Sequence, residues 1–390
     1  MVGLKRAIPP GVWVLGFVSL LMDTSSEMIH CLLPLFLVSE LGVSALTVGV
    51  IEGIAEATAS ITKVFSGVVS DALGKRKPLV LFGYGLAALT KPVFALAPTV
   101  GWVVAARFAD RFGKGIRGAP RDALIADISP PEVVGASFGL RQSLDTIGAF
   151  SGPLIAMGLM ALYHNNYRLV FMAATIPALL TVLLIVMGVR EPTDHKTKSA
   201  KPIHWTDLKQ FPRRYWGVIG IAFVMTLARF SEGFLLLRVQ SVGLDVALAP
   251  AVLVAMNVVY AASSYPVGIL SDKLGRTGLL LWGFAVLILA DAVLAVAGSP
   301  ALVLVGVALW GLHMGMTQGL LSALVADTAP APLRGTAFGV FNLSIGIALL
   351  LASVIAGALW TLLGPAYTFM AGAGFTALSL VAFWGWNRER

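Results

Sequence analysis

Ionisable residues recur at helical spacing near the start of the chain. Asp23, Glu27 and His30 follow one another at intervals of four and three residues, so they share one face of a helix. Apolar surroundings disfavour the charged form of a carboxylic acid, and an acid placed there can bind and release a proton near neutral pH. We therefore predict a proton-coupling site at Asp23 and Glu27. The alternative is that each acid permanently neutralises a basic residue of a neighbouring helix.

Five basic residues share a second predicted helix face, at intervals of four, three, three and four residues. They are Arg107, Arg111, Lys114, Arg117 and Arg121. A charge deep in a membrane is costly unless it is paired or faces water. We expect Arg111 and Lys114 to line a water-filled cavity, whereas Arg121 lies at the cytoplasmic rim, solvated or paired with Asp122 and Asp127.

Three further pairs of charged residues are spaced by one helical turn. The pairs are Glu52 with Glu56, Arg141 with Asp145, and Arg229 with Glu232. Combined with the two helix faces, they give the following candidates for proton or substrate binding: Asp23, Glu27, His30, Glu52, Glu56, Arg111, Lys114, Arg117, Arg141, Asp145 and Glu232.

Two groups of histidine and sulfur residues suggest a different chemistry. Met28 and Cys31 lie near His30, and Met314 and Met316 lie near His313. Histidine with sulfur ligands suits Cu(I), and histidine with carboxylates suits Ni(II), Fe(II) or Zn(II). Methionine is common in apolar helices, however, and we predict no bound metal. His30 and His313 are the candidates on which a metal-transport alternative would rest.

The elements that carry these residues are predicted to be membrane-spanning helices. Of the 390 residues, 57% are hydrophobic and 12% charged, against about 25% charged in a soluble domain. The apolar residues form blocks of about 18 or more, long enough to cross a bilayer. We predict twelve helices, at 12–38, 45–70, 78–97, 100–126, 137–162, 168–190, 214–240, 247–271, 277–298, 300–326, 335–362 and 365–387.

The ends of the sequence and its cysteine content add two expectations. The first apolar block starts near Gly11 and is too long for a signal-peptide core, so we expect it to remain in the protein. The chain has one cysteine, Cys31, which excludes an internal disulfide.

The distribution of basic residues sets the expected orientation. The formal net charge of +8 could point to a nucleic-acid partner, but lysine and arginine gather in alternate loops, as the positive-inside rule requires. The opposite loops hold only Arg168. We therefore predict a multi-pass protein of the cell inner membrane with both termini in the cytoplasm, and no nucleic-acid partner.

The two halves of the chain repeat at an offset of about 200 residues. DALIADISPPEVVGASFG at 122–139 matches SALVADTAPAPLRGTAFG at 322–339 without a gap. Internal repeats of this kind are typical of secondary transporters. We predict an N-terminal six-helix bundle at 1–190, a cytoplasmic linker at 191–213 and a C-terminal six-helix bundle at 214–390.

A loop motif occurs at the same place in each half, as GVVSDALGKR at 67–76 and as GILSDKLGR at 268–276. Both copies resemble the G-x-x-x-D-R/K-x-G-R/K signature of the major facilitator superfamily, from which Ala72 departs. The resemblance implies an all-α membrane protein in which two six-helix bundles rock about a central site. It also implies a set of cytoplasmic gating residues: Gly67, Asp71, Gly74, Arg76, Asp127, Gly268, Asp272, Gly275 and Arg276.

Two further motifs resemble those of proton-driven exporters of that superfamily. Gly148, Gly152 and Pro153 form the pattern G-x-x-x-G-P, and Arg111 with Gly115 forms R-x-x-x-G, in which the arginine assists proton transfer. The glycines usual after the proline are absent. Small residues four apart also let two membrane helices approach closely, so the first motif could serve packing alone. We favour export over import.

These observations predict proton-coupled efflux of small molecules by alternating access. The expected partners are a small-molecule substrate, protons and the lipid bilayer, and the chain is expected to act as a monomer. No G-x-x-x-x-G-K-S/T phosphate loop occurs in the sequence, so we expect a proton gradient to drive transport, with no cofactor and no enzymatic activity. The alternatives are an importer or exchanger of organic anions, indicated by the basic stripe, and a transition-metal transporter.

Overall fold

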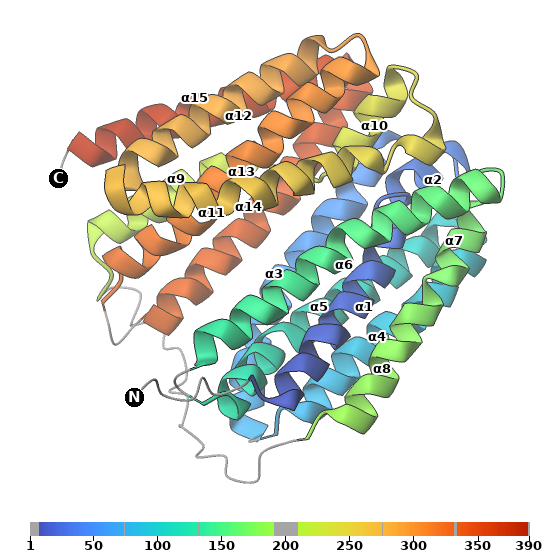
Figure 1. The fold of residues 1–390 in the computed structure, drawn as a ribbon. Helices are drawn as coiled ribbons and strands as arrows, with labels where there is room; N and C mark the ends of the chain where they lie inside the picture. The colour runs from blue at the N-terminus through green and yellow to red at the C-terminus, as the bar shows by residue number, and fades with distance from the viewer. Residues whose placement is uncertain are drawn as a thin grey trace. The chain divides into compact units, whose positions relative to one another are not determined.

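Helices make up the regular structure of this protein. The computed structural model describes residues 8–73, 75–130, 133–190, 210–274, 276–330 and 334–388, and these ranges contain helices but no strand (Figure 1). The first half holds α1 (Pro10–His30), α2 (Leu33–Ser39), α3 (Ala45–Leu73), α4 (Lys77–Leu96), α5 (Val100–Ile128), α6 (Val134–Leu162), α7 (Tyr167–Ala173) and α8 (Thr175–Gly188). The second half holds α9 (Arg213–Leu227), α10 (Gly233–Ser241), the 3-10 helix η3 (Val246–Leu248), α11 (Ala251–Leu274), α12 (Arg276–Val296), α13 (Pro300–Thr328), α14 (Arg334–Leu363) and α15 (Pro365–Arg388). The prediction of an all-α membrane protein is confirmed.

Within the described residues, ten segments are long and apolar enough to cross a membrane. Two of the twelve predicted spans are not among these ten, each for its own reason. The helix α5 carries eight charged residues among its 29. The helices α9 and α10 are each shorter than the about 20 residues that a span needs, because the helix predicted there is interrupted.

Proline divides two of the predicted helices. Pro34 has no N–H, and its ring would clash with the carbonyl of His30, four positions earlier. Accordingly, α1 ends at His30 and α2 begins at Leu33. Pro177 has the same relation to Ala173, the last residue of α7. Both predicted spans are present as single segments, Pro10–Ser39 and Tyr167–Gly188, but the helix within each is interrupted.

A third interruption separates α9 from α10, and no proline causes it. Residues 228–232 leave the helix, and we call them the α9–α10 break. The Ser231 N–H donates to Ser353 Oγ at 3.2 Å, and the Gly233 N–H donates to Ser231 Oγ at 3.2 Å. Side-chain oxygens therefore replace helical acceptors at this point. The continuous helix predicted at 214–240 is wrong here.

The helices form two compact units that do not coincide with the halves of the repeat. Unit 1 comprises the described residues of Met1–His30 and Thr58–Pro202, and unit 2 those of Cys31–Ala57 and Ile203–Arg390. Thus α2 and the first part of α3 belong with the C-terminal helices. The bundle boundaries at 190 and 214 remain a prediction, and most of the predicted linker, 191–209, lies outside the described residues.

In unit 1 the most extensively packed helix pairs are α1 with α6 and α4 with α5 (Figure 1). Val18, Met22 and Tyr84 are buried in the apolar core of this unit. Gly83 and Gly113 face each other closely. A Cβ added at Gly83 would lie 2.6 Å from the Gly113 carbonyl oxygen, so a larger residue would force α4 and α5 apart.

In unit 2, α12 packs against α13 and α15, and α11 packs against α13. Leu280, Phe284 and Phe383 are buried in its main apolar cluster. The first part of α3 lies directly against α14, since a Cβ added at Gly53 would lie 2.9 Å from the Leu350 carbonyl oxygen. This contact explains why that segment of α3 belongs to unit 2.

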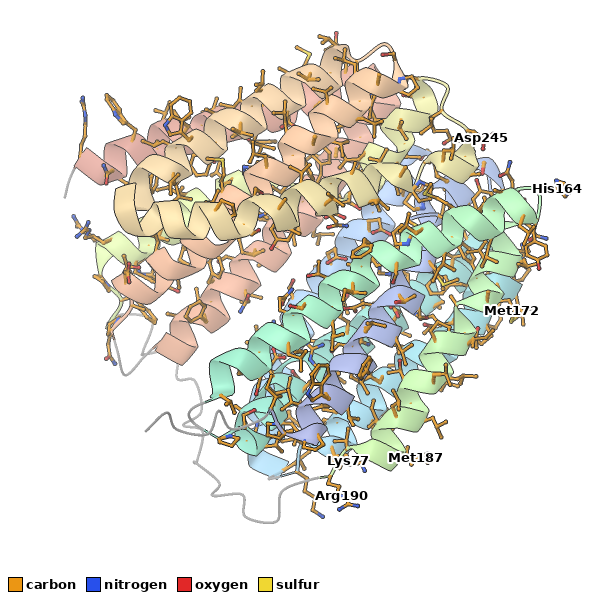
Figure 2. The ribbon with its side chains drawn as sticks, in the orientation of Figure 1. Lys77, His164, Met172, Met187, Arg190 and Asp245 are labelled. Carbon is orange, nitrogen blue, oxygen red and sulfur yellow. The ribbon has the colours of Figure 1, made fainter. Side chains whose placement is uncertain are left out.

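One end of unit 1 is marked by basic residues. Figure 2 shows Lys77 and Arg190 at this end and His164 at the opposite one. Lys77 Nζ donates to the carbonyl of Val189 at 2.6 Å, just beyond the last residue of α8. A cation at a helix C-terminus satisfies free carbonyls and complements the helix dipole. Such a grouping of basic residues is what the positive-inside pattern requires of one membrane face.

Large apolar side chains remain exposed on the outside of unit 1. Met172 and Met187 project outward from α7 and α8 (Figure 2), and Phe65 and Leu89 are exposed on α3 and α4. Exposed apolar side chains over helices whose backbone groups bond internally suit contact with lipid. The chain is a multi-pass membrane protein.

Candidate functional site

Six ionisable residues of unit 1 form what we call the buried charge cluster. Its members come from α1, α4 and α5: Glu27, His30, Lys91, Arg107, Asp110 and Arg111. Charges are tolerated at membrane depth when they are paired or face water. Each member of this cluster contacts another member, so pairing accounts for their burial.

Lys91 and Asp110 are the innermost pair of the buried charge cluster. Lys91 Nζ lies 2.9 Å from Asp110 Oδ1, and the two side chains are 0% and 2% exposed. Lys91 also donates to Ser26 Oγ at 3.1 Å, which ties α4 to α1 as well as to α5. Arg111 donates to Asp110 Oδ2 from Nε at 3.2 Å and from Nη2 at 3.1 Å. Both carboxylate oxygens of Asp110 are therefore held by cations.

His30 lies between the carboxylates and the guanidinium groups of the cluster. Its Nδ1 is 3.6 Å from Glu27 Oε1, and its Nε2 is 3.7 Å from Asp110 Oδ2. Arg107 and Arg111 also contact the ring nitrogens. With His30 neutral, three cations and two carboxylates leave the cluster with an excess of one positive charge. The arrangement suits a chemistry of proton or anion binding.

Two glycines of α6 hold that helix against the acidic face of α1. A Cβ added at Gly148 would lie 3.0 Å from Asp23 Cβ, and one added at Gly152 would lie 2.7 Å from Glu27 Cβ. The helix α6 runs on through Pro153. The G-x-x-x-G-P segment is thus a close-packing motif that fixes the backbone beneath both acids.

A second group of charges, the Asp122 cluster, lies further along α5 in unit 1. Its members are Tyr84, Arg117, Arg121, Asp122, Arg141 and Asp145. Arg121 Nε donates to Asp122 Oδ1 at 3.1 Å, and Arg141 Nη1 lies 3.6 Å from the same oxygen. Arg141 also pairs with Asp145. The predicted pairing of Arg141 with Asp145 is confirmed, and of the two partners predicted for Arg121, Asp122 is the one it contacts here.

The basic stripe predicted on α5 is divided between these two clusters. Arg107 and Arg111 contact His30, whereas Arg117 stacks on the Tyr84 ring, with its Cζ 4.4 Å from the ring centroid. Lys114, between them, is exposed, and its charge acts on Glu27. The basic residues share one helix face, but different acids of α5 itself pair with its two ends: Asp110 with Arg111, and Asp122 with Arg121.

The remaining predicted binding residues do not join the buried charge cluster. The charge of Asp23 acts on Arg117 and Arg121 of the Asp122 cluster. Three acids belong to unit 2: Glu52, Glu56 and Glu232. Among these, Glu52 is buried and accepts a hydrogen bond from Ser231 Oγ of the α9–α10 break at 3.3 Å.

Two of the predicted gating residues form an ion pair. Arg76 Nε lies 2.6 Å from Asp127 Oδ2, which joins the start of α4 to the end of α5. Gly67 faces Ala119 of α5 at ordinary contact distance. Gly74 and Gly275 lie outside the described residues, as do the side-chain surroundings of the others: Asp71, Gly268, Asp272 and Arg276.

Neither candidate histidine belongs to a metal-binding group. Two guanidinium groups contact His30, and they would repel a metal cation. His313 Nδ1 donates to the Gly283 carbonyl at 2.9 Å. The described residues contain no group of three or more histidine, cysteine, aspartate or glutamate side chains that could hold a metal ion. The geometry therefore does not favour the metal-transport alternative.

Sequence reasoning missed four buried charged residues: Lys91, Asp110, Arg238 and Asp291. A usable signal was present. Lys91 is the only charged residue of α4 after its first position, and Asp291 is the only one of α12 after its first position. A single charged residue in an apolar helix needs a partner or must be neutral. Each of these residues therefore predicts a polar or charged partner on a neighbouring helix.

The all-α fold, the internal repeat and the buried charges at membrane depth define a polytopic transporter. The model of the Major Facilitator Superfamily matches residues 15–253 and 218–390, and the chain belongs to this superfamily. An uncharacterised MFS-type transporter of Methanocaldococcus jannaschii is 32% identical over 96% of this chain and 94% of its own length. Members of the superfamily are transporters and not enzymes, in agreement with the prediction.

Two other comparisons extend this result. The gentisate transporter of Corynebacterium glutamicum is 28% identical over 90% of this chain and 81% of its own length. The solved structure of the nucleoside transporter NupG has a TM-score of 0.81 at 15% identity, and covers 96% of this chain and 99% of that one. At that identity the structural likeness establishes the fold alone.

Proposed function

We propose that the chain is a proton-coupled secondary transporter that exports small molecules by alternating access. One observation carries the proposal. His30 lies between the carboxylates of Glu27 and Asp110, and the guanidinium groups of Arg107 and Arg111 contact its ring. This is a compact set of mutually dependent ionisable groups inside a membrane-spanning unit, and a change of one proton changes the balance of all of them.

The exchangeable proton is assigned to Glu27 and His30. Asp110 is 2% exposed and both of its oxygens are held by cations, so it serves as a fixed counter-charge. Glu27 is 26% exposed and can exchange a proton with water. Burial favours its protonated form and the nearby cations favour its charged form, so its proton occupancy responds to what binds beside it.

Export is the proposed direction. The support comes from the resemblance of Gly148, Gly152 and Pro153 to an exporter motif and from their close contact with the acidic face of α1. The Arg76–Asp127 ion pair is proposed to be part of the cytoplasmic gate. We further propose a monomer in the inner membrane with both termini in the cytoplasm, on the strength of the basic-residue pattern.

A second candidate function is transport of organic anions. The excess positive charge of the buried charge cluster favours it, since an anion entering there gains a counter-charge. A gentisate transporter is among the relatives of the chain, at 28% identity. Both functions use the same cluster, and they differ in the substrate that moves.

Transport by purified protein in proteoliposomes tests both candidates. The substrate panel contains aromatic carboxylates including gentisate, nucleosides and cationic dyes. Each compound is tested with and without an imposed pH gradient, and a pH-sensitive dye inside the vesicles reports proton movement. We expect at least one compound to move against its own concentration gradient while protons move across the membrane in the opposite direction. Movement of carboxylates alone would replace the first candidate by the second. No gradient-driven movement of any compound would contradict the proton-coupled proposal.

A matched pair of histidine variants locates the coupling. His30→Asn removes the ring inside the buried charge cluster, and His164→Asn changes an exposed residue of the same unit whose positive φ of 52° asparagine tolerates. We expect His30→Asn to lose pH-driven transport while it keeps substrate exchange without a gradient. We expect His164→Asn to behave as the parent protein does. Full pH-driven transport by His30→Asn would place the coupling elsewhere.

A further inference from the structure

Asp291 is a buried carboxyl group of unit 2 that the proposed mechanism does not use. It lies on α12 and is 0% exposed. Its Oδ1 accepts a hydrogen bond from the Trp310 indole of α13 at 3.1 Å. Its Oδ2 has no hydrogen-bond partner among the described residues. Half of this carboxyl group is therefore satisfied and half is not.

Apolar groups surround the free oxygen. A Cβ added at Gly372 of α15 would lie 2.5 Å from Asp291 Oδ2 and 3.4 Å from the Phe230 ring. Phe230 in turn packs against Trp310 and Phe369, at ring-centroid distances of 5.8 and 5.5 Å. The absence of a side chain at Gly372 leaves the space that Oδ2 occupies.

The charged groups on neighbouring elements are engaged elsewhere. On α13, the His313 ring donates to the Gly283 carbonyl. On α10, the Arg238 guanidinium donates to the carbonyls of Leu294 and Ala297. The helix α15 carries no charged residue before Arg388.

The remaining neighbours also leave Asp291 without a counter-charge. In the α9–α10 break, Arg229 and Glu232 interact with each other. The described side chains of α11 include one titratable group, Tyr260. Across the part of unit 2 that the structure describes, no cation lies within ion-pair distance of the Asp291 carboxyl group. A carboxylate left alone in such surroundings is strongly disfavoured, and a bound proton removes its charge.

The internal repeat supports the same conclusion independently. Asp291 and Trp310 lie 200 positions after Lys91 and Asp110. In unit 1 these positions hold an ion pair, whereas in unit 2 they hold an acid and an indole N–H. The indole can satisfy one oxygen of a carboxyl group but carries no charge to neutralise it.

We propose that Asp291 is a second proton-binding site, a neutral carboxylic acid that stores a proton directly behind the α9–α10 break. Phe230 belongs to that break and packs against the partner of Asp291, Trp310. Release of the proton to water leaves a carboxylate, which can be stabilised only after water or a cation reaches it. Proton occupancy at Asp291 and the conformation of the break are therefore linked.

Infrared difference spectroscopy of the full-length protein in a lipid film tests the proposal. The C=O stretch of a protonated carboxylic acid is resolved from the bands of carboxylates, and a step from neutral to high pH reveals the acids that lose a proton. We expect a protonated-acid band in the parent protein that is lost in Asp291→Asn. The matched control is Asp245→Asn, an exposed aspartate of the same unit, which we expect to keep the band.

A second variant tests the protonation of Asp291 even where Asp291→Asn fails to fold. Trp310→Phe removes the hydrogen bond to Oδ1 and keeps an aromatic ring, so the protonated-acid band is expected to shift in frequency. A band that is unchanged in both variants, or a parent protein without such a band, overturns the proposal. The measurement needs neither substrate nor gradient, so its outcome is independent of the proposed transport function.

Discussion

Lys91 and Asp110 neutralise each other across the interface between α4 and α5, at 2.9 Å and almost without exposure to solvent. The pair lies next to His30 and supplies the fixed charge against which the other ionisable groups of the cluster are balanced. The Asp110 carboxylate joins α4 to α5 and also contacts Arg111, so we expect its removal to affect both the stability of the protein and proton coupling.

Removal of one member of this pair should destabilise the protein strongly. Asp110→Asn leaves the fully buried Lys91 without its counter-charge, at a cost of about 3–5 kcal/mol. The double variant Lys91→Met with Asp110→Asn should recover part of that loss. Thermal unfolding of the purified protein in detergent measures both. Strictly additive losses would show that the two residues do not interact, and Asp245→Asn, which retains a capping side chain, serves as the neutral control.

The contact between α6 and α1 predicts a steric effect at Gly152. A Cβ there would lie 2.6 Å from the Thr24 carbonyl oxygen, so Gly152→Ala should force the helices apart at a cost of about 1–3 kcal/mol. Gly158 lies on the same helix with nothing within 4 Å of an added Cβ. Gly158→Ala should therefore be neutral or slightly stabilising. Equal melting temperatures for the two variants would contradict the close contact.

Glu27 should set the pH dependence of transport if it carries the exchangeable proton. In Glu27→Gln the side chain is neutral at every pH, so transport should lose its pH dependence while exchange without a gradient continues. The measurement is the pH profile of both activities in proteoliposomes. Glu40→Gln changes an exposed acid after α2 and should leave the profile unaltered. A normal profile for Glu27→Gln would transfer the role to His30.

The ion pair between Arg76 and Asp127 should matter more for gating than for stability. Both side chains are partly exposed, and pairs of this kind contribute about 0–1 kcal/mol. Arg76→Asp should slow transport with little change in melting temperature. The exchanged pair, Arg76→Asp with Asp127→Arg, should restore part of the rate. A rate that stays low in the exchanged pair would indicate that another contact of Arg76 is responsible.

The sequence was sufficient to predict the helices because apolar blocks of membrane length are hard to mistake. It also contained the causes of two interruptions, since Pro34 and Pro177 each remove an N–H and crowd the carbonyl four residues earlier. The α9–α10 break could not be predicted in this way. Its backbone is held by Ser231 and by Ser353, which is 122 positions away, and only the folded structure brings them together.

The candidate site was predicted in part. Helical spacing correctly placed Glu27 with His30, and Arg107 with Arg111, on common faces. It could not reveal that Lys91 and Asp110 join them, because spacing within one helix says nothing about which neighbouring helix faces it. Asp23 shares the face of α1 that carries Glu27, as predicted, but its charge acts on arginines of the Asp122 cluster.

The two interruptions in equivalent helices of the repeat are unlike in their cause. Pro34 has no N–H to donate to the carbonyl of His30, so the cause of that interruption is built into the covalent chain. Residues 228–232 contain no proline, and the Ser231 N–H donates to a side chain, Ser353 Oγ, instead of a helical carbonyl. The two interruptions therefore differ in origin: the first follows from a missing backbone N–H, and the second rests on hydrogen bonds to serine side chains.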